Sequence, residues 1–128
     1  MKDFKKYYTI SATPEEVYMA LTNPLTLELW TGDATEMSTE PGSEFSLWGG
    51  SIVGKNLEFD PSKKIVQQWY FDGEPEDSIV TIKLHPAKNN STSVELRHTN
   101  IPDKVYDDFA SGWDDYYFGP LAEFFEGE

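Results

Sequence analysis

Alternating apolar and polar residues dominate the chain from Asp3 to Ile101, with one early helical stretch as the interruption. Period-two alternation broken by turn residues is typical of an antiparallel sheet with one buried face. The pattern predicts seven strands, over Phe4–Ser11, Ala34–Ser38, Glu44–Trp48, Ser51–Asp60, Lys64–Asp72, Ser78–His85 and Thr92–Ile101. Gly49 and Gly50 are expected to form a tight hairpin, because primed turns need positive φ.

Two short helices are expected after the first strand. Thr13 and Glu16 have capping-box spacing, and a proline follows Thr13 at the first helical position, where a missing amide costs nothing. The first helix should run to about Thr22. Leu25–Trp30 should form the second, ending at Gly32.

A long C-terminal helix is predicted from Asp103, as its cap, to about Phe125. Its apolar stripe recurs every four residues, at Val105, Phe109, Trp113, Tyr117 and Leu121, and is widened by Tyr116, Phe124 and Phe125. Pro120 lies inside this pattern and cannot donate a backbone hydrogen bond, so we expect a kink there.

This helix is the only predicted element able to cover the apolar face of the sheet. We therefore predict one α+β domain over residues 1–128, in which the C-terminal helix covers one face of an antiparallel sheet. A chain of 128 residues suits one such core.

Charge and composition narrow the possible partners. The chain has 10 basic and 23 acidic residues, a net charge of −13, and no cysteine. Such a surface repels nucleic acids and anionic membranes, and the lack of thiols excludes disulfides and thiolate chemistry. The first residues show no signal peptide or membrane span, so we expect a cytoplasmic protein.

His98 is the first candidate for chemistry, because alternation places it on the buried face with Val94 and Leu96. It either orients a ligand or acts as an acid or base, or it is a core histidine bonded to a tyrosine or the backbone. His85 is expected to be exposed and without a role. No carboxylate accompanies either histidine at ligand spacing, so no metal site is predicted.

The acidic pairs Asp107-Asp108 and Asp114-Asp115 are expected to be solvated on the outer face of the last helix. No motif for nucleophilic catalysis is present. Trp30 and Trp48 are either partly buried or exposed partner contacts.

Several segments together carry a family resemblance. They are 11–18 (SATPEEVY), 45–54 (FSLWGGSIVG), 65–69 (IVQQW), 101–102 (IP), 112–113 (GW) and 116–118 (YYF). Their order and spacing resemble the C-terminal domain of the activators of heat-shock protein ninety ATPase, a branch of the START-like or SRPBCC superfamily. The resemblance spans nearly the whole chain. It implies the helix-grip fold, in which a curved antiparallel sheet wraps around the long C-terminal helix, with two short helices after the first strand. It also implies an apolar cavity between sheet and last helix, and a link to the chaperone.

We therefore predict a non-enzymatic interaction module with a heat-shock-protein-ninety-type chaperone as its partner and no cofactor. The alternative is a carrier or sensor of a small apolar ligand. Its cavity would be lined by Phe45, Trp69, Val94, Leu96, His98, Phe109, Trp113 and Tyr117. These rings could also simply fill the core. An enzyme such as a cyclase or dehydratase, with His98 as acid or base, is a third hypothesis.

Overall fold

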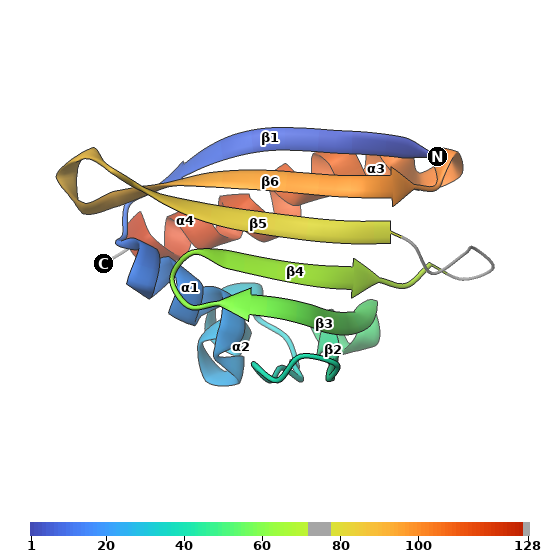
Figure 1. Cartoon of the computed structure of the whole chain (residues 1–128), viewed down its shortest axis with the longest axis horizontal. Helices are drawn as coiled ribbons and strands as arrows, with labels where there is room; N and C mark the ends of the chain where they lie inside the picture. Colours follow the sequence, from blue (N-terminus) through green and yellow to red (C-terminus); the bar gives the residue numbers. More distant parts are fainter. Residues whose placement is uncertain (72–77, 127–128) are drawn as a thin grey trace.

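Six strands form one antiparallel sheet in the computed structural model, which describes residues 1–71 and 78–126. The sheet order is β1-β6-β5-β4-β3-β2. The strands are β1 (Lys2–Ile10), β2 (Glu44–Leu47), β3 (Ile52–Asp60), β4 (Lys64–Trp69), β5 (Ser78–Ala87) and β6 (Ser91–Ile101). The C-terminal helix runs along one face of this sheet, behind it as drawn in Figure 1. The predicted α+β helix-grip class is confirmed.

The predicted strand over Ala34–Ser38 is wrong. Only one isolated bridge forms there, in which Glu36 and Ser46 exchange backbone hydrogen bonds of 2.8 and 2.9 Å. Beyond it, the side-chain amide of the buried Asn56 donates to the Ser38 carbonyl at 3.1 Å. The segment thus makes one bridge and a side-chain contact instead of a ladder, and the described residues hold six strands rather than seven.

The connection between β2 and β3 is longer than predicted. Leu47 pairs with Ile52, so four residues rather than the two glycines connect the strands. The two glycines do adopt positive φ, 64° at Gly49 and 99° at Gly50. Trp48 also has a positive φ, 51°, which is rare for a bulky residue. The chain therefore turns through three consecutive left-handed residues.

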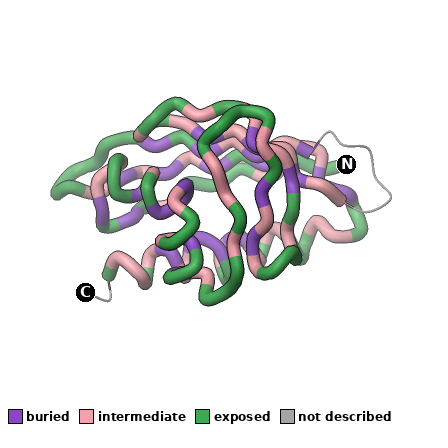
Figure 2. The backbone as a smooth tube through the Cα atoms, turned by 90° about the horizontal axis from the view of Figure 1, so that it is seen from below, coloured by how far each residue is buried: buried purple, intermediate pink, exposed green. Residues whose placement is uncertain are grey.

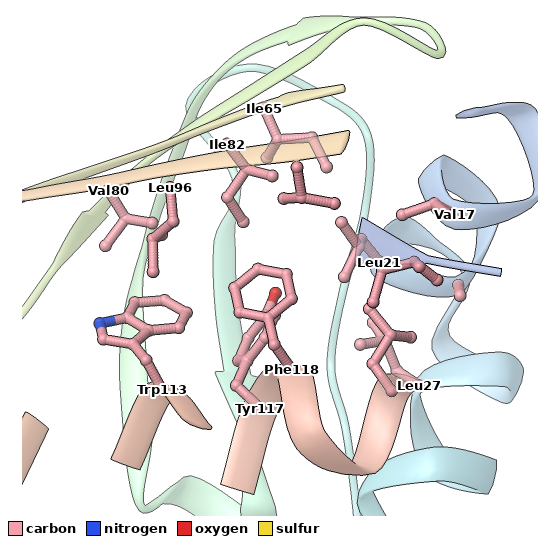
Figure 3. Packing of buried hydrophobic residues seen from close by; sticks show 14 of the residues in the cluster. Val17, Leu21, Leu27, Ile65, Val80, Ile82, Leu96, Trp113, Tyr117 and Phe118 are labelled. Atoms are coloured by element: carbon pink, nitrogen blue, oxygen red, sulfur yellow. The ribbon is translucent and has the colours of Figure 1, made fainter. Parts of the chain in front are cut away.

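The two short helices form as predicted, as α1 (Pro14–Thr22) and α2 (Pro24–Thr31). The Thr13 hydroxyl accepts from the Glu16 amide, and the Glu16 carboxylate accepts from the Thr13 amide. Gly32 ends α2 with a φ of 74°. Both helices pack on the face that the C-terminal helix covers, where they supply Val17, Leu21 and Leu27 to the core (Figure 3).

The C-terminal helix changes its winding along its length. It begins with a 3-10 turn (Asp103–Val105), followed by α3 (Tyr106–Gly112), a π-helical segment (Trp113–Phe118) and α4 (Gly119–Glu126). Asp103 is not the predicted cap. Its carboxylate pairs with the amino group of Met1 at 2.7 Å instead. The helix continues through Pro120, and the Gly119 amide reaches back five residues to the Asp114 carbonyl just before it.

The π-helical turn places one more aromatic ring in the core than the four-residue spacing predicts. Trp113, Tyr117 and Phe118 all point from the helix toward the sheet (Figure 3), with exposures of 2%, 4% and 1%. The wider turn brings neighbouring residues onto one face. Tyr116, expected to widen the stripe, is 68% exposed. Buried positions gather between the sheet and the last helix (Figure 2).

Within residues 1–71 and 78–126, no helix has both the length and the apolar character needed to span a membrane.

Replacing Gly54 by alanine should destabilise the fold. A Cβ at this position would lie 2.0 Å from the Gln68 carbonyl oxygen and 2.8 Å from the Phe45 ring. Overpacking of this kind typically costs about 1–3 kcal/mol, and here backbone would have to move. Urea unfolding should show the loss. Gly112→Ala is the control, because its nearest contact would be 3.8 Å, and equal stability of the two variants would contradict the packing described.

Candidate functional site

A pocket of about 440 Å3 opens between the last helix and the β3–β4 end of the sheet. Four segments of the chain supply its walls. They contribute Asp33 after α2, then Trp48, Ser51 and Ile52 at the β2–β3 connection, Trp69 at the end of β4, and Asp108, Phe109, Gly112, Trp113, Tyr116 and Tyr117 from the last helix. Six of these eleven residues are aromatic, so the lining is mostly apolar.

Four of the eight residues predicted to line a cavity do so, namely Trp69, Phe109, Trp113 and Tyr117. The other four are Phe45, Val94, Leu96 and His98, which are at most 2% exposed and belong to the packed interior behind the pocket. The aromatic rings fill that interior, so the open space lies closer to the sheet edge than predicted. Whether a ligand occupies it stays a prediction.

The predicted cavity lining does not include the pocket wall that faces the last helix, where Trp48 lies. Its indole packs at right angles to that of Trp30, with the ring centres 6.5 Å apart, and 6.0 Å from Tyr117. The sequence signal was present, since Trp48 directly precedes two glycines. Trp30 itself is buried, and its indole donates to the Ala20 carbonyl at 2.8 Å.

His98 is fully buried and its ring is bonded on both sides. Trp113 Nε1 can only donate, and it lies 3.1 Å from His98 Nδ1, so Nδ1 is the acceptor. The proton of the neutral ring is therefore on Nε2, which donates to Ser78 Oγ at 2.9 Å. Ser78 in turn donates to the Thr99 carbonyl at 3.1 Å. The partners differ from the tyrosine or backbone expected for a core histidine.

Burial lowers the pKa of the His98 imidazole to about 3, and the negative charge of Asp3 only partly opposes this shift. His98 is thus neutral at physiological pH. Both of its nitrogens are engaged with protein groups, so it has no free atom with which to anchor a ligand in the pocket. What it does is hold Trp113, and with it one wall of the pocket.

A second chain of buried polar groups holds Trp69. Its indole donates to Gln67 Oε1 at 3.1 Å, and Gln67 Nε2 donates to Asn56 Oδ1 at 3.1 Å. Asn56 then donates to Ser38 and Ser43. Trp69 and Trp113 are stacked, with ring centres 4.8 Å apart and planes 30° apart. Hydrogen bonds to His98 and Gln67, each part of a buried polar network, therefore fix the two stacked rings of the pocket.

The Tyr117 hydroxyl has no hydrogen-bond partner among the described residues, and its residue lines the pocket. Burial raises the pKa of the Tyr117 phenol above its ordinary value, so it stays protonated. It is one of the polar groups of the pocket lining, together with Asp33, Ser51 and Asp108.

Charge is segregated between the two faces of the molecule. Between Tyr106 and Glu126 the last helix carries six acidic residues and no basic one. On the sheet face turned away from this helix, Lys64, Lys83 and Arg97 border a shallow hollow with Glu95. Asp114 departs from the prediction of a solvated carboxylate, because it accepts from Tyr8 at 2.7 Å and from Lys6 at 2.9 Å.

No metal site is apparent in the described part of the chain, where no three potential ligand side chains cluster. His98 and His85 point to opposite faces of the sheet, and His85 instead lies 3.3 Å from Glu95.

The fold and the pocket define the class as an α+β helix-grip protein with an aromatic pocket beside the last helix. Residues 11–126 match the family described as Activator of Hsp90 ATPase homolog 1-like protein, and the chain belongs to that family. The resemblance noted from the sequence motifs is thereby confirmed.

Individual relatives and solved structures are similar to this chain along most of its length. The crystal structure of an HSP90 activator from Plasmodium falciparum is 29% identical, covers 99% of this chain and 97% of its own, and superposes with a TM-score of 0.88. A Chromobacterium violaceum protein of known structure is 26% identical over the full length of both chains, with a TM-score of 0.79. An activator of 90 kDa heat shock protein ATPase homolog from Dictyostelium discoideum is 32% identical over 114 residues. That match covers 88% of this chain but 30% of the relative.

The buried histidine should make stability fall in mild acid. Between pH 6.5 and 3 the unfolded chain binds a proton at His98 that the folded chain does not, so the free energy of unfolding drops as pH falls, by about 1.4 kcal/mol per pH unit. Urea unfolding at several pH values should show a shallower slope for His98→Gln than for wild type. His85→Gln retains His98 and should keep the wild-type slope; equal slopes in all three proteins would contradict the assignment.

Proposed function

We propose that this chain is a non-enzymatic binding domain that docks on a heat-shock-protein-ninety-type chaperone. Family membership is the observation that carries this, supported by the activators among the relatives. The chain spans about a third of the length of the curated relatives it matches, 30% and 37%. Docking of this one domain, rather than the full activity of those proteins, is therefore what we propose.

The acidic face of the last helix is the proposed contact surface. Asp107, Asp115, Glu123 and Glu126 are all exposed there. A surface of one charge sign accelerates association with an oppositely charged surface and is screened by salt. The partner surface should therefore be basic.

The geometry of His98 supports a binding role over catalysis. An acid or base must come within hydrogen-bond reach of the substrate, directly or through one water. His98 is fully buried, and its two nitrogens bond Trp113 and Ser78.

Neutralising the acidic helix face should slow chaperone binding. A variant with Asp107→Asn, Asp115→Asn, Glu123→Gln and Glu126→Gln should associate roughly tenfold or more slowly at low salt. Stopped-flow or surface-based kinetics with the chaperone from the same cell would measure this. Lys83→Gln with Arg97→Gln on the opposite face is the matched control. A pull-down that stays empty at low salt, or equal slowing by both variants, would contradict the proposal.

A second candidate function is the binding of a small apolar ligand, and the aromatic pocket is the observation that favours it. Its volume of about 440 Å3 lies within the range of roughly 300–1,000 Å3 usual for small-molecule sites. Trp69 and Trp113 are fixed from behind, so the site is largely pre-formed.

Filling the pocket should remove any bound ligand without unfolding the protein. Gly112 lines the pocket, and the nearest atom to a Cβ there would be in the Tyr116 ring at 3.8 Å, so Gly112→Leu should occupy part of the pocket. Native mass spectrometry of protein purified from its own host should show an added mass in wild type and in Ser111→Leu, an exposed neighbour on the same helix, but not in Gly112→Leu. An added mass in none of the three would contradict this candidate.

A further inference from the structure

We propose that the aromatic pocket selects an organic cation, namely an ammonium group carried on a flat apolar body. This inference rests on the second function proposed above, that the pocket binds a small ligand. The rings and charges around the pocket determine the ligand class.

The rings provide the first argument. Three of the four tryptophans of the chain, Trp48, Trp69 and Trp113, line this one pocket, together with Phe109, Tyr116 and Tyr117. The face of an aromatic ring is negative, and tryptophan attracts cations most strongly. An apolar pocket with this many rings therefore favours a cation over an anion of the same shape.

No cation of the protein occupies these rings in the described residues. The lysine–ring contacts there involve Lys2 with Tyr106, Lys5 with Tyr7, and Lys6 with Tyr8. None of these rings lines the pocket. The pocket rings therefore hold no cation from the described part of the protein. Trp69 and Trp113 stack on each other, so the rings open to a cation from outside are the more exposed Trp48, Phe109 and Tyr116.

The charges provide the second argument. The charged residues that line the pocket are Asp33 and Asp108, and no basic residue of the described chain lines it. They come from different walls, Asp33 from the end of α2 and Asp108 from α3. The Asp108 carboxylate has no hydrogen bond or ion pair among the described residues. An anionic ligand would meet two like charges, whereas an ammonium group would be attracted by both.

The backbone at Trp48 provides the third argument. Trp48 has a φ of 51°, a conformation that is uncommon for a bulky residue and that clusters at ligand sites. The Gly49 amide bonds the Ala34 carbonyl at 3.0 Å, next to Asp33, and the Asp33 carboxylate lies beside Gly49. The turn therefore brings the strained backbone of Trp48 and Gly49 next to Asp33, and both Trp48 and Asp33 line the pocket.

Three ligands with one naphthalene body test the proposal: naphthylmethyl-trimethylammonium, naphthalenemethanol and naphthaleneacetate. Calorimetry should show the cation binding about tenfold more tightly than the alcohol, with the acetate weakest. Indole NMR signals of Trp48, Trp69 and Trp113 should shift on binding, and that of Trp30, which lies outside the pocket, should shift least. Added salt should weaken the binding of the cation but not that of the alcohol.

Two matched variants locate the charge effect. Asp108→Asn should lower the affinity for the cation by about three- to fivefold and leave that for the alcohol unchanged. Asp107→Asn, one residue away and outside the pocket lining, should change neither beyond the small effect of a more distant charge. If the alcohol or the acetate binds as tightly as the cation, the ligand class is wrong while the pocket function stands. If none of the three binds, the pocket function fails and this inference fails with it.

Discussion

The docking of the last helix on the sheet is the constraint on which the rest of the structure depends. One buried hydrogen bond, from Trp113 to His98, joins the helix to β6 within an otherwise apolar interface. A lost partner in such a place leaves a buried polar group unpaired, which costs about 1–3 kcal/mol. The bond therefore fixes the rotation of the helix, and its geometry requires a neutral imidazole. At the rim, Asp114 fixes the same helix to β1 through Tyr8 and Lys6.

The π-helical turn then determines what each side of the helix presents. It turns Trp113, Tyr117 and Phe118 inward together, and Phe118 stacks on Tyr8 with ring centres 4.4 Å apart. The wide turn also leaves Tyr116 largely exposed at the pocket mouth. π-turns inside α-helices often occur at functional sites. Here the irregular winding both completes the core and forms a wall of the pocket.

Much of the fold could be predicted from the sequence, because alternation, the Thr13–Glu16 capping box and the stripe of the last helix are local signals. The site could be predicted only in part. Trp69 and Trp113 follow from face and spacing, but Trp48 lies in the pocket through a left-handed turn that alternation does not describe. Likewise, the partners of His98 lie 15 and 20 residues away along the chain, so only the tertiary structure identifies them. The strand over Ala34–Ser38 follows from local alternation, but no local signal reveals that pairing there is limited to one bridge between Glu36 and Ser46.

The two proposed functions share one stretch of the molecule. Asp108 lies on α3 at the pocket lining, and its neighbour Asp107 belongs to the proposed chaperone contact face. A basic partner surface docked on that face would lie next to the pocket mouth and compete with a cationic ligand for the same negative field. An apolar ligand without charge would not be affected in this way. Whether partner binding weakens ligand binding therefore depends on the charge of the ligand. Asp108 links the two sites, because it lines the pocket and lies next to Asp107 on the proposed contact face.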